Sequence, residues 1–198
     1  MRSHQRALVR FGMMAAGCVL LAVPSQGETP TNAFAVYQSD QPQLPLRLEY
    51  PTGWDVELSS GKMEPYTQVQ FYAPASLESR LRIYLVARAL PPKAAGGRYA
   101  DVGELAASYR ASLPPTFAIN GERATTVLGV SARQVGVAGT LQLPWMSSNA
   151  HPVSVVGQRV FCERAGRLYE FAWLATPAAA PQVEAAFMHL LETLAPLE

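Results

Sequence analysis

The sequence is poor in cysteine and histidine. Its 198 residues include two cysteines, Cys18 and Cys162, and three histidines. Zinc sites are built from about three or four clustered cysteine, histidine or acidic ligands, and the chain shows no such spacing. We therefore expect neither a metal site nor a cofactor.

Motifs that carry common enzyme chemistry are also missing. The nucleophile elbow Gly-x-Ser-x-Gly does not occur, and Ser131 in "LGVSARQVG" fails its spacing. The pair Gly96-Gly97 is not followed by the Gly-Lys-Ser/Thr of a phosphate-binding loop. These absences favour a binding module over an enzyme. The alternative is an envelope enzyme with Cys162 or Ser131 as its nucleophile, although the apolar neighbours of Cys162 indicate a buried thiol.

The apolar run near the amino terminus is short. Three arginines lie within the first ten residues, residues 11–23 are mostly apolar, and small residues follow at Ser25 and Gly27. This is the layout of a secretory signal peptide, and the run is shorter than the roughly 20 residues that span a bilayer. We therefore predict that residues 1–27 are a signal peptide cleaved after Gly27, with Ser25 as the second choice. The protein is then exported to the periplasm or the extracellular space, without a transmembrane span in the mature chain.

A lipid anchor is the alternative outcome of export. Small residues stand directly before Cys18, as in a lipoprotein signal. The most apolar segment, residues 19–23, follows Cys18, where a lipoprotein would already be mature and polar. The sequence therefore favours Cys18 as an apolar residue of the signal peptide over an anchored cysteine.

Basic residues show no excess. Removal of the three arginines in residues 1–27 leaves 13 basic and 15 acidic residues, a net charge of −2. Nucleic acids and anionic lipid surfaces select dense basic patches. We therefore expect neither as a partner.

The alternation of apolar and polar residues predicts an α+β domain. Period-two alternation is typical of strands with one buried face, and recurrence every three or four residues is typical of an amphipathic helix. Residues 28–43 are polar and are predicted to be a linker, whose short apolar patch at residues 33–37 could dock on the domain. Residues 44–198 are predicted to be a single domain with an antiparallel β-sheet covered by helices. Strands are expected near residues 46–50, 54–58, 69–73, 81–87, 125–130, 133–143, 153–163 and 168–174, and helices near residues 101–113 and 183–194.

Several local features sharpen this prediction. Asp101 and Glu104 resemble a capping box at a helix start, and Asn120-Gly121 predicts a tight turn. Tyr50 and Trp54 flank the turn residues Pro-Thr-Gly in "LEYPTGWDV", and we expect this aromatic pair to serve packing.

Isolated polar residues are expected to be solvated. His189 is expected to face solvent beside Glu192 on the last helix. Glu163 and Glu170 could face each other across the late hairpin, but single carboxylates on a strand are usually hydrated.

One loop is the candidate binding region. Residues 144–152, "PWMSSNAHP", bring Trp145, Met146 and His151 into a segment that we expect to be exposed. Loops often carry function, and tryptophan and methionine suit adaptable contacts. The alternative is that Trp145 folds back as a lid on the core.

Three segments resemble the PsbP-like superfamily, which includes DcrB-like envelope proteins. They are the opening "LRLEYPTGWDV", the hairpin "VFCERAGRLYEFAWLAT" and the closing helix "EAAFMHLLETL". The resemblance covers most of residues 44–198. It implies an α/β/α sandwich around an antiparallel sheet, and a non-enzymatic accessory or binding module that contacts an envelope protein or a small ligand.

The processed chain is expected to begin at Glu28 without added acyl mass, because cleavage follows Gly27. Intact-mass spectrometry of the exported protein measures this. A mature chain that begins at Cys18 and carries acyl groups would contradict the signal-peptide prediction and establish the lipid anchor.

Overall fold

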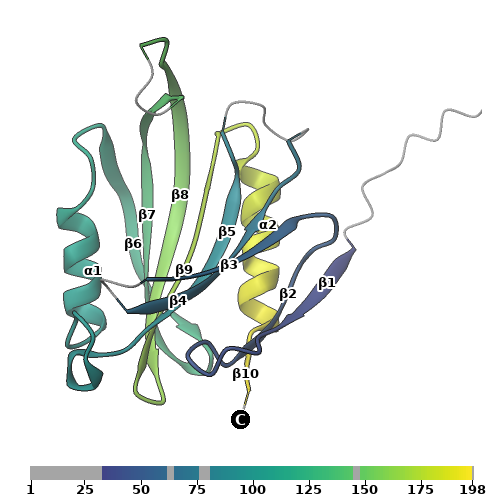
Figure 1. Cartoon of the computed structure of the whole chain (residues 1–198). Helices are drawn as coiled ribbons and strands as arrows, with labels where there is room; N and C mark the ends of the chain where they lie inside the picture. Colours follow the sequence, from purple (N-terminus) through teal and green to yellow (C-terminus); the bar gives the residue numbers. More distant parts are fainter. Residues whose placement is uncertain (1–32, 62–64, 76–80, 145–147, 198) are drawn as a thin grey trace, which may run out of the picture. The chain divides into compact units, whose positions relative to one another are not determined.

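Seven antiparallel strands form the main sheet, in the order β3-β4-β5-β9-β8-β7-β6 (Figure 1). The computed structural model describes residues 33–61, 65–75, 81–144 and 148–197, and these belong to the unit Asn32–Glu198. The strands are β3 (Asp55–Gly61), β4 (Tyr66–Tyr72), β5 (Tyr84–Leu90), β6 (Phe117–Val127), β7 (Val130–Leu143), β8 (His151–Arg164) and β9 (Arg167–Ala175).

A second sheet has three strands, with β2 at its centre. Here β1 (Phe34–Gln38) and β10 (Ala195–Pro196) both pair antiparallel with β2 (Leu46–Pro51). The leucines of β2 are buried in the same apolar cluster as the main sheet. The small sheet therefore shares its core with one face of the large one.

The two helices cover opposite faces of the main sheet. Successive side chains of a strand point to opposite faces, and Phe161 packs in a cluster with α1 (Val102–Ala111). Its neighbour Val160 packs in a cluster with α2 (Ala180–Thr193). The prediction of an antiparallel sheet between helices is confirmed.

The Tyr-Pro-Thr-Gly-Trp corner joins the two sheets, because it passes the chain from β2 to β3. Gly53 has a φ of 83°, a left-handed conformation that glycine adopts without steric cost. The Tyr50 ring stacks on Phe71 with centroids 4.6 Å apart, and Trp54 is buried in the core. The prediction that this aromatic pair serves packing is confirmed.

Two-residue turns connect the long strands of the sheet. Ala165 and Gly166, between β8 and β9, have φ values of 49° and 68°. Leu128 and Gly129, between β6 and β7, have φ values of 55° and 74°. Positive φ at both central residues is the pattern of the tight hairpin turn that matches strand twist. The late hairpin was predicted, whereas the turn at Leu128 was not.

Three expectations need correction. Residues 34–38 lie in the predicted linker but form β1, because they find an open edge on β2. Asn120 lies at a register shift between Ile119 and Gly121 within β6, a bulge and not a turn. Alternation in the predicted strand near residues 54–58 puts Val56 and Leu58 on its buried face with Trp54, but they are 40% and 47% exposed, since β3 is the edge strand of its sheet.

Helix α1 begins at the predicted cap. The Asp101 side chain accepts the backbone N–H of Glu104 at 2.8 Å, and the Glu104 carboxylate accepts the N–H of Ala100 at 2.6 Å. The helix packs against β7 and β8 on one face of the main sheet. In the part of the chain that the structure describes, no helix covers the same face of β3 and β4 (Figure 1).

No helix in the described part of the chain combines the length and apolarity that crossing a membrane would require.

Replacement of Phe187 by alanine is expected to lower the free energy of unfolding by about 3–5 kcal/mol, since its ring fills the core under α2. The matched control is Met188→Ala at the next position, which is 39% exposed and should cost less than about 1 kcal/mol. Urea denaturation followed by circular dichroism measures both. Equal losses in the two variants would contradict the burial of this helix face.

Candidate functional site

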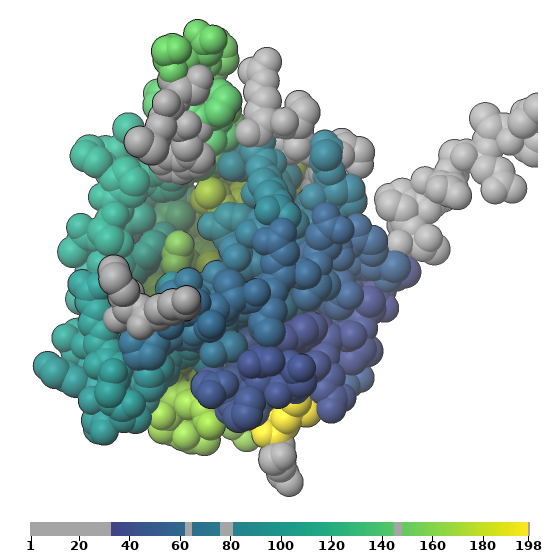
Figure 2. Space-filling view, viewed as in Figure 1, coloured from purple at the N-terminus to yellow at the C-terminus, as the bar shows by residue number. Residues whose placement is uncertain are grey.

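A cleft of about 440 Å³ lies between α1 and the main sheet. Figure 2 shows it as a hollow between the teal of α1 and the blue of β3 and β4, with the green of β8 and β9 at its floor. Aromatic, apolar and charged side chains line it. They include Tyr84, Arg88, Arg98, Tyr99, Tyr109, Phe117, Leu141, Arg159, Phe161, Glu170 and Leu174.

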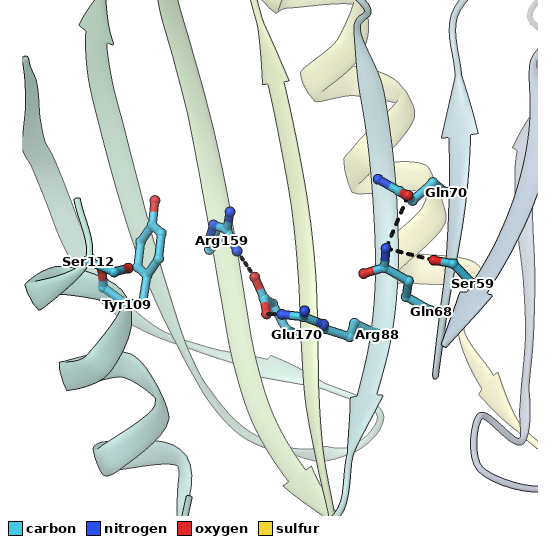
Figure 3. Close-up of polar contacts among 8 residues, drawn as sticks. All are labelled: Ser59, Gln68, Gln70, Arg88, Tyr109, Ser112, Arg159 and Glu170. Carbon is cyan, nitrogen blue, oxygen red and sulfur yellow. Dashed lines mark hydrogen bonds and ion pairs between the residues drawn. The ribbon is translucent and has the colours of Figure 1, made fainter. Parts of the chain in front are cut away.

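A buried carboxylate forms the floor of this cleft. Glu170 of β9 is 3% exposed and lies between Arg88 of β5 and Arg159 of β8 (Figure 3). Arg88 Nη1 donates to Glu170 Oε2 at 3.1 Å, and Arg159 Nη1 pairs with Glu170 Oε1. A carboxylate removed from water is tolerated when such charged partners compensate it. The ion pairs therefore link three adjacent strands.

Strand alternation explains why these charges meet. Glu170 is paired in register with Arg88, so both side chains leave the sheet on the α1 face. Their sequence neighbours Ala87 and Phe171 point to the α2 face, where they join the apolar core. The α1 face of β5 and β9 thus holds this ion pair among apolar residues, whereas the α2 face is buried and apolar.

Tyrosine rings flank both guanidinium groups. The Arg88 guanidinium lies 4.2 Å from the centroid of Tyr66, and that of Arg159 lies 4.4 Å from the centroid of Tyr109 on α1. A cation over the face of an aromatic ring is attracted by the negative charge of that face. Burial raises the pKa of Tyr109, although Arg159 opposes this shift. The Tyr109 hydroxyl therefore remains a hydrogen-bond donor at neutral pH.

The polar floor continues onto the part of the sheet that α1 leaves uncovered. Gln68 is paired with Arg88 in the β4–β5 register. Its Nε2 donates to Ser59 Oγ on β3 at 3.0 Å and to Gln70 Oε1 at 3.1 Å (Figure 3). Polar side chains therefore cross this face from β3 to β8.

Of the residues predicted to bind, only His151 lies within the described part of the chain, and it does not line this cleft. Trp145 and Met146 lie outside the described residues, so their role stays a prediction. His151 was expected in a loop, but it is the first residue of β8, exposed and paired with Leu143. The strand extends this far because the long hairpin partner β7 continues opposite it.

Cys162 has the properties of an inert core thiol. It is fully buried on the α2 face, and burial raises its pKa from 9.0 to about 12. A nucleophilic cysteine needs a thiolate near neutral pH. The expectation of a buried thiol is confirmed, and the alternative with Cys162 as the nucleophile finds no support.

Ser131 lies at the start of β7, exposed beside Arg123 and Arg133. None of the described residues that line this shallow hollow is a histidine, and the one acid among them, Glu122, is ion-paired with Arg110. Among the described residues there is also no group of three or more histidine, cysteine or acidic side chains that could hold a metal ion.

His189 is not solvated beside Glu192 as expected. Its Nε2 lies 2.9 Å from Glu49 Oε2 on β2, and its ring stacks on Phe34 of β1 at a centroid distance of 3.6 Å. This histidine therefore fastens α2 to the small sheet. The pairing was missed because β1 was assigned to a linker.

The expected solvation of Glu170 was also wrong. Its register partner on β8 is Phe161, and Glu163 pairs with Leu168, so the two carboxylates do not face each other. A signal was present, because Arg88 and Glu170 are the single charges within the apolar runs of residues 84–90 and 168–175. Two lone charges of opposite sign in separate apolar strands indicate an internal ion pair.

Comparison with known proteins identifies the fold. No protein-family model and no curated protein matches this chain. The solution structure of cyanobacterial PsbP (CyanoP) from Synechocystis sp. PCC 6803 matches with a TM-score of 0.53 and 11% identity, over 88% of this chain and 98% of that chain. The crystal structure of PA94, a protein of unknown function from Pseudomonas aeruginosa, matches with a TM-score of 0.50 and 19% identity, over 83% of this chain and 98% of that chain.

These matches place the fold of this chain among the α+β sandwiches. The fold of this chain is PsbP-like, as the three sequence segments predicted.

Native Cys162 is expected to resist thiol reagents at pH 8 and to react once the chain is unfolded, because the folded protein buries it as a neutral thiol. Absorbance after addition of Ellman's reagent, with and without denaturant, measures this. Because the pKa of this thiol is raised from 9.0 to about 12 in the folded state, its contribution to the free energy of unfolding is fully present below pH 9 and is lost as the pH rises towards 12. Rapid native labelling would contradict the assignment.

Proposed function

We propose that the protein is an exported, non-enzymatic binding module of the cell envelope, and that it holds a small ligand in the cleft between α1 and the main sheet. The observation that carries this proposal is the cleft itself. Its volume of about 440 Å³ falls within the roughly 300–1,000 Å³ range of small-molecule sites. The predicted signal peptide at residues 1–27 supports export.

The composition of the cleft also supports binding. Small-molecule sites combine aromatic and apolar walls with a few convergent polar groups that orient the ligand. Here the walls come from residues such as Phe117 and Leu141, and the polar groups are the ion-paired floor and the Tyr109 hydroxyl.

The chemistry of the floor favours binding over catalysis. A general base needs an acceptor that is within reach of a substrate proton. The carboxylate oxygens of Glu170 are both engaged by guanidinium groups, and the thiol of Cys162 is buried on the opposite face. The same groups are well placed to orient a bound molecule.

A bulky residue in the cleft is expected to abolish ligand binding. Ser108 lines the cleft, whereas Ala107, the preceding residue of α1, is exposed and does not. Amide spectra of the processed protein should shift at α1 when protein-free envelope extract is added. Ser108→Trp should lose these shifts, and the matched control Ala107→Trp should keep them.

Two results would contradict the proposal. One is a wild-type spectrum that the extract leaves unchanged. The other is an equal response from Ser108→Trp and Ala107→Trp, because binding would then occur elsewhere on the molecule.

A further inference from the structure

The floor of the cleft carries more positive than negative charge. Arg88 and Arg159 share the one carboxylate of Glu170, so the three groups together hold a net charge of +1. Glu170 is the only acid among the described residues that line the cleft. A ligand that brings a negative charge would balance this surplus.

One donor of Arg88 is buried without an acceptor. Its Nη1 donates to Glu170, but its Nε has no hydrogen-bond partner within the described part of the chain. A buried N–H without an acceptor costs free energy. The side chain is 25% exposed and lines the cleft, so Arg88 is both incompletely paired and open to the cleft.

The unpaired part of Arg88 has a planar shape. A guanidinium presents its N–H donors as a rigid fork, and the two oxygens of a carboxylate match such a fork with two parallel hydrogen bonds. Glu170 accepts from Nη1 and Nε is buried, so a ligand reaches this guanidinium through the exposed part of the side chain. A planar carboxylate is an acceptor that suits such a group.

Beyond the charged floor the cleft becomes apolar. Leu141 and Leu174 lie towards the carboxyl ends of β7 and β9, and Phe117 of β6 packs with them. Apolar surface of this kind is best covered by the hydrocarbon part of a ligand. The charged part of the cleft therefore suits the polar group of a ligand, and the apolar part suits its hydrocarbon body.

We propose that the ligand of this cleft is a small organic carboxylate with an apolar body, whose carboxylate binds Arg88 beside the Glu170 ion pairs and whose body lies against Phe117, Leu141 and Leu174. This inference rests on the proposed function and adds the chemical class of the ligand. Tyr109, which keeps its proton at neutral pH, is a second donor on the cleft wall.

The test compares acids with their uncharged amides. Calorimetric titration of the processed protein with 3-phenylpropionate and with octanoate should give saturable binding, and the two probes distinguish an aromatic from an aliphatic body. The corresponding amides have nearly the same shape without the charge. They should bind at least about tenfold more weakly, because a charge-assisted hydrogen-bond pair is lost.

Matched arginine variants locate the charge. Arg88→Met should weaken binding of the acids at least about tenfold. The control is Arg82→Met, which removes the same charge from an exposed ion pair with Glu57 that does not line the cleft. This control should leave the affinity within about twofold of wild type, since exposed charges are screened.

The outcomes separate this inference from the proposed function. Equal affinity for acid and amide, or an unchanged affinity in Arg88→Met, overturns the carboxylate assignment. If neither acid binds but the extract still shifts α1 in a way that Ser108→Trp abolishes, the carboxylate assignment fails while the proposed function stands. If the extract response also fails, both are overturned. Should Arg88→Met not fold, the acid-to-amide ratio and the loss of acid binding in Ser108→Trp still decide the matter.

Discussion

The ion pairs of Glu170 are the constraint on which the rest of the α1 face depends. A carboxylate that is 3% exposed persists in the fold because two guanidinium groups compensate it. Those guanidinium groups, on Arg88 and Arg159, remain a quarter to a third exposed, and complete removal from water would add a desolvation penalty that can exceed what their pairing returns. An open cleft beside α1 avoids that penalty, whereas the apolar α2 face carries no such charges and is closed.

The two faces of the main sheet differ in how their side chains are buried. On the α2 face, Phe71, Phe171 and Phe187 are fully buried in one apolar cluster that also includes the leucines of β2. This cluster accounts for most of the burial that stabilises the chain. Because stability is supplied there, the α1 face can keep charges and an open volume that a core would exclude. The domain thus combines a packed side with a side that keeps an open cleft.

Much of the fold was accessible from the sequence, because alternation and capping are local signals. The strands from β2 to β5, the late hairpin and both helices were predicted, since each depends on neighbours along the chain. The candidate site depends on distant partners: Arg88 and Glu170 are 82 positions apart, and His189 and Glu49 are 140 positions apart. Period-two alternation places a side chain on a face but does not say which strand lies beside it. For the same reason β1 was taken as linker and the edge position of β3 was missed.

The central pairing of the main sheet joins the two halves of the chain. Strands β6 to β9 follow one another as consecutive hairpins, but Tyr84 at the start of β5 is paired with Leu174 near the end of β9. Contacts between residues so far apart in sequence are slow to form, because loop closure costs entropy before any contact repays it. The pairing of β5 therefore requires β9, which lies near the end of the chain. Until β9 has paired, the apolar side of β4 and β5 is exposed, and exposed apolar surface of this kind promotes aggregation during folding.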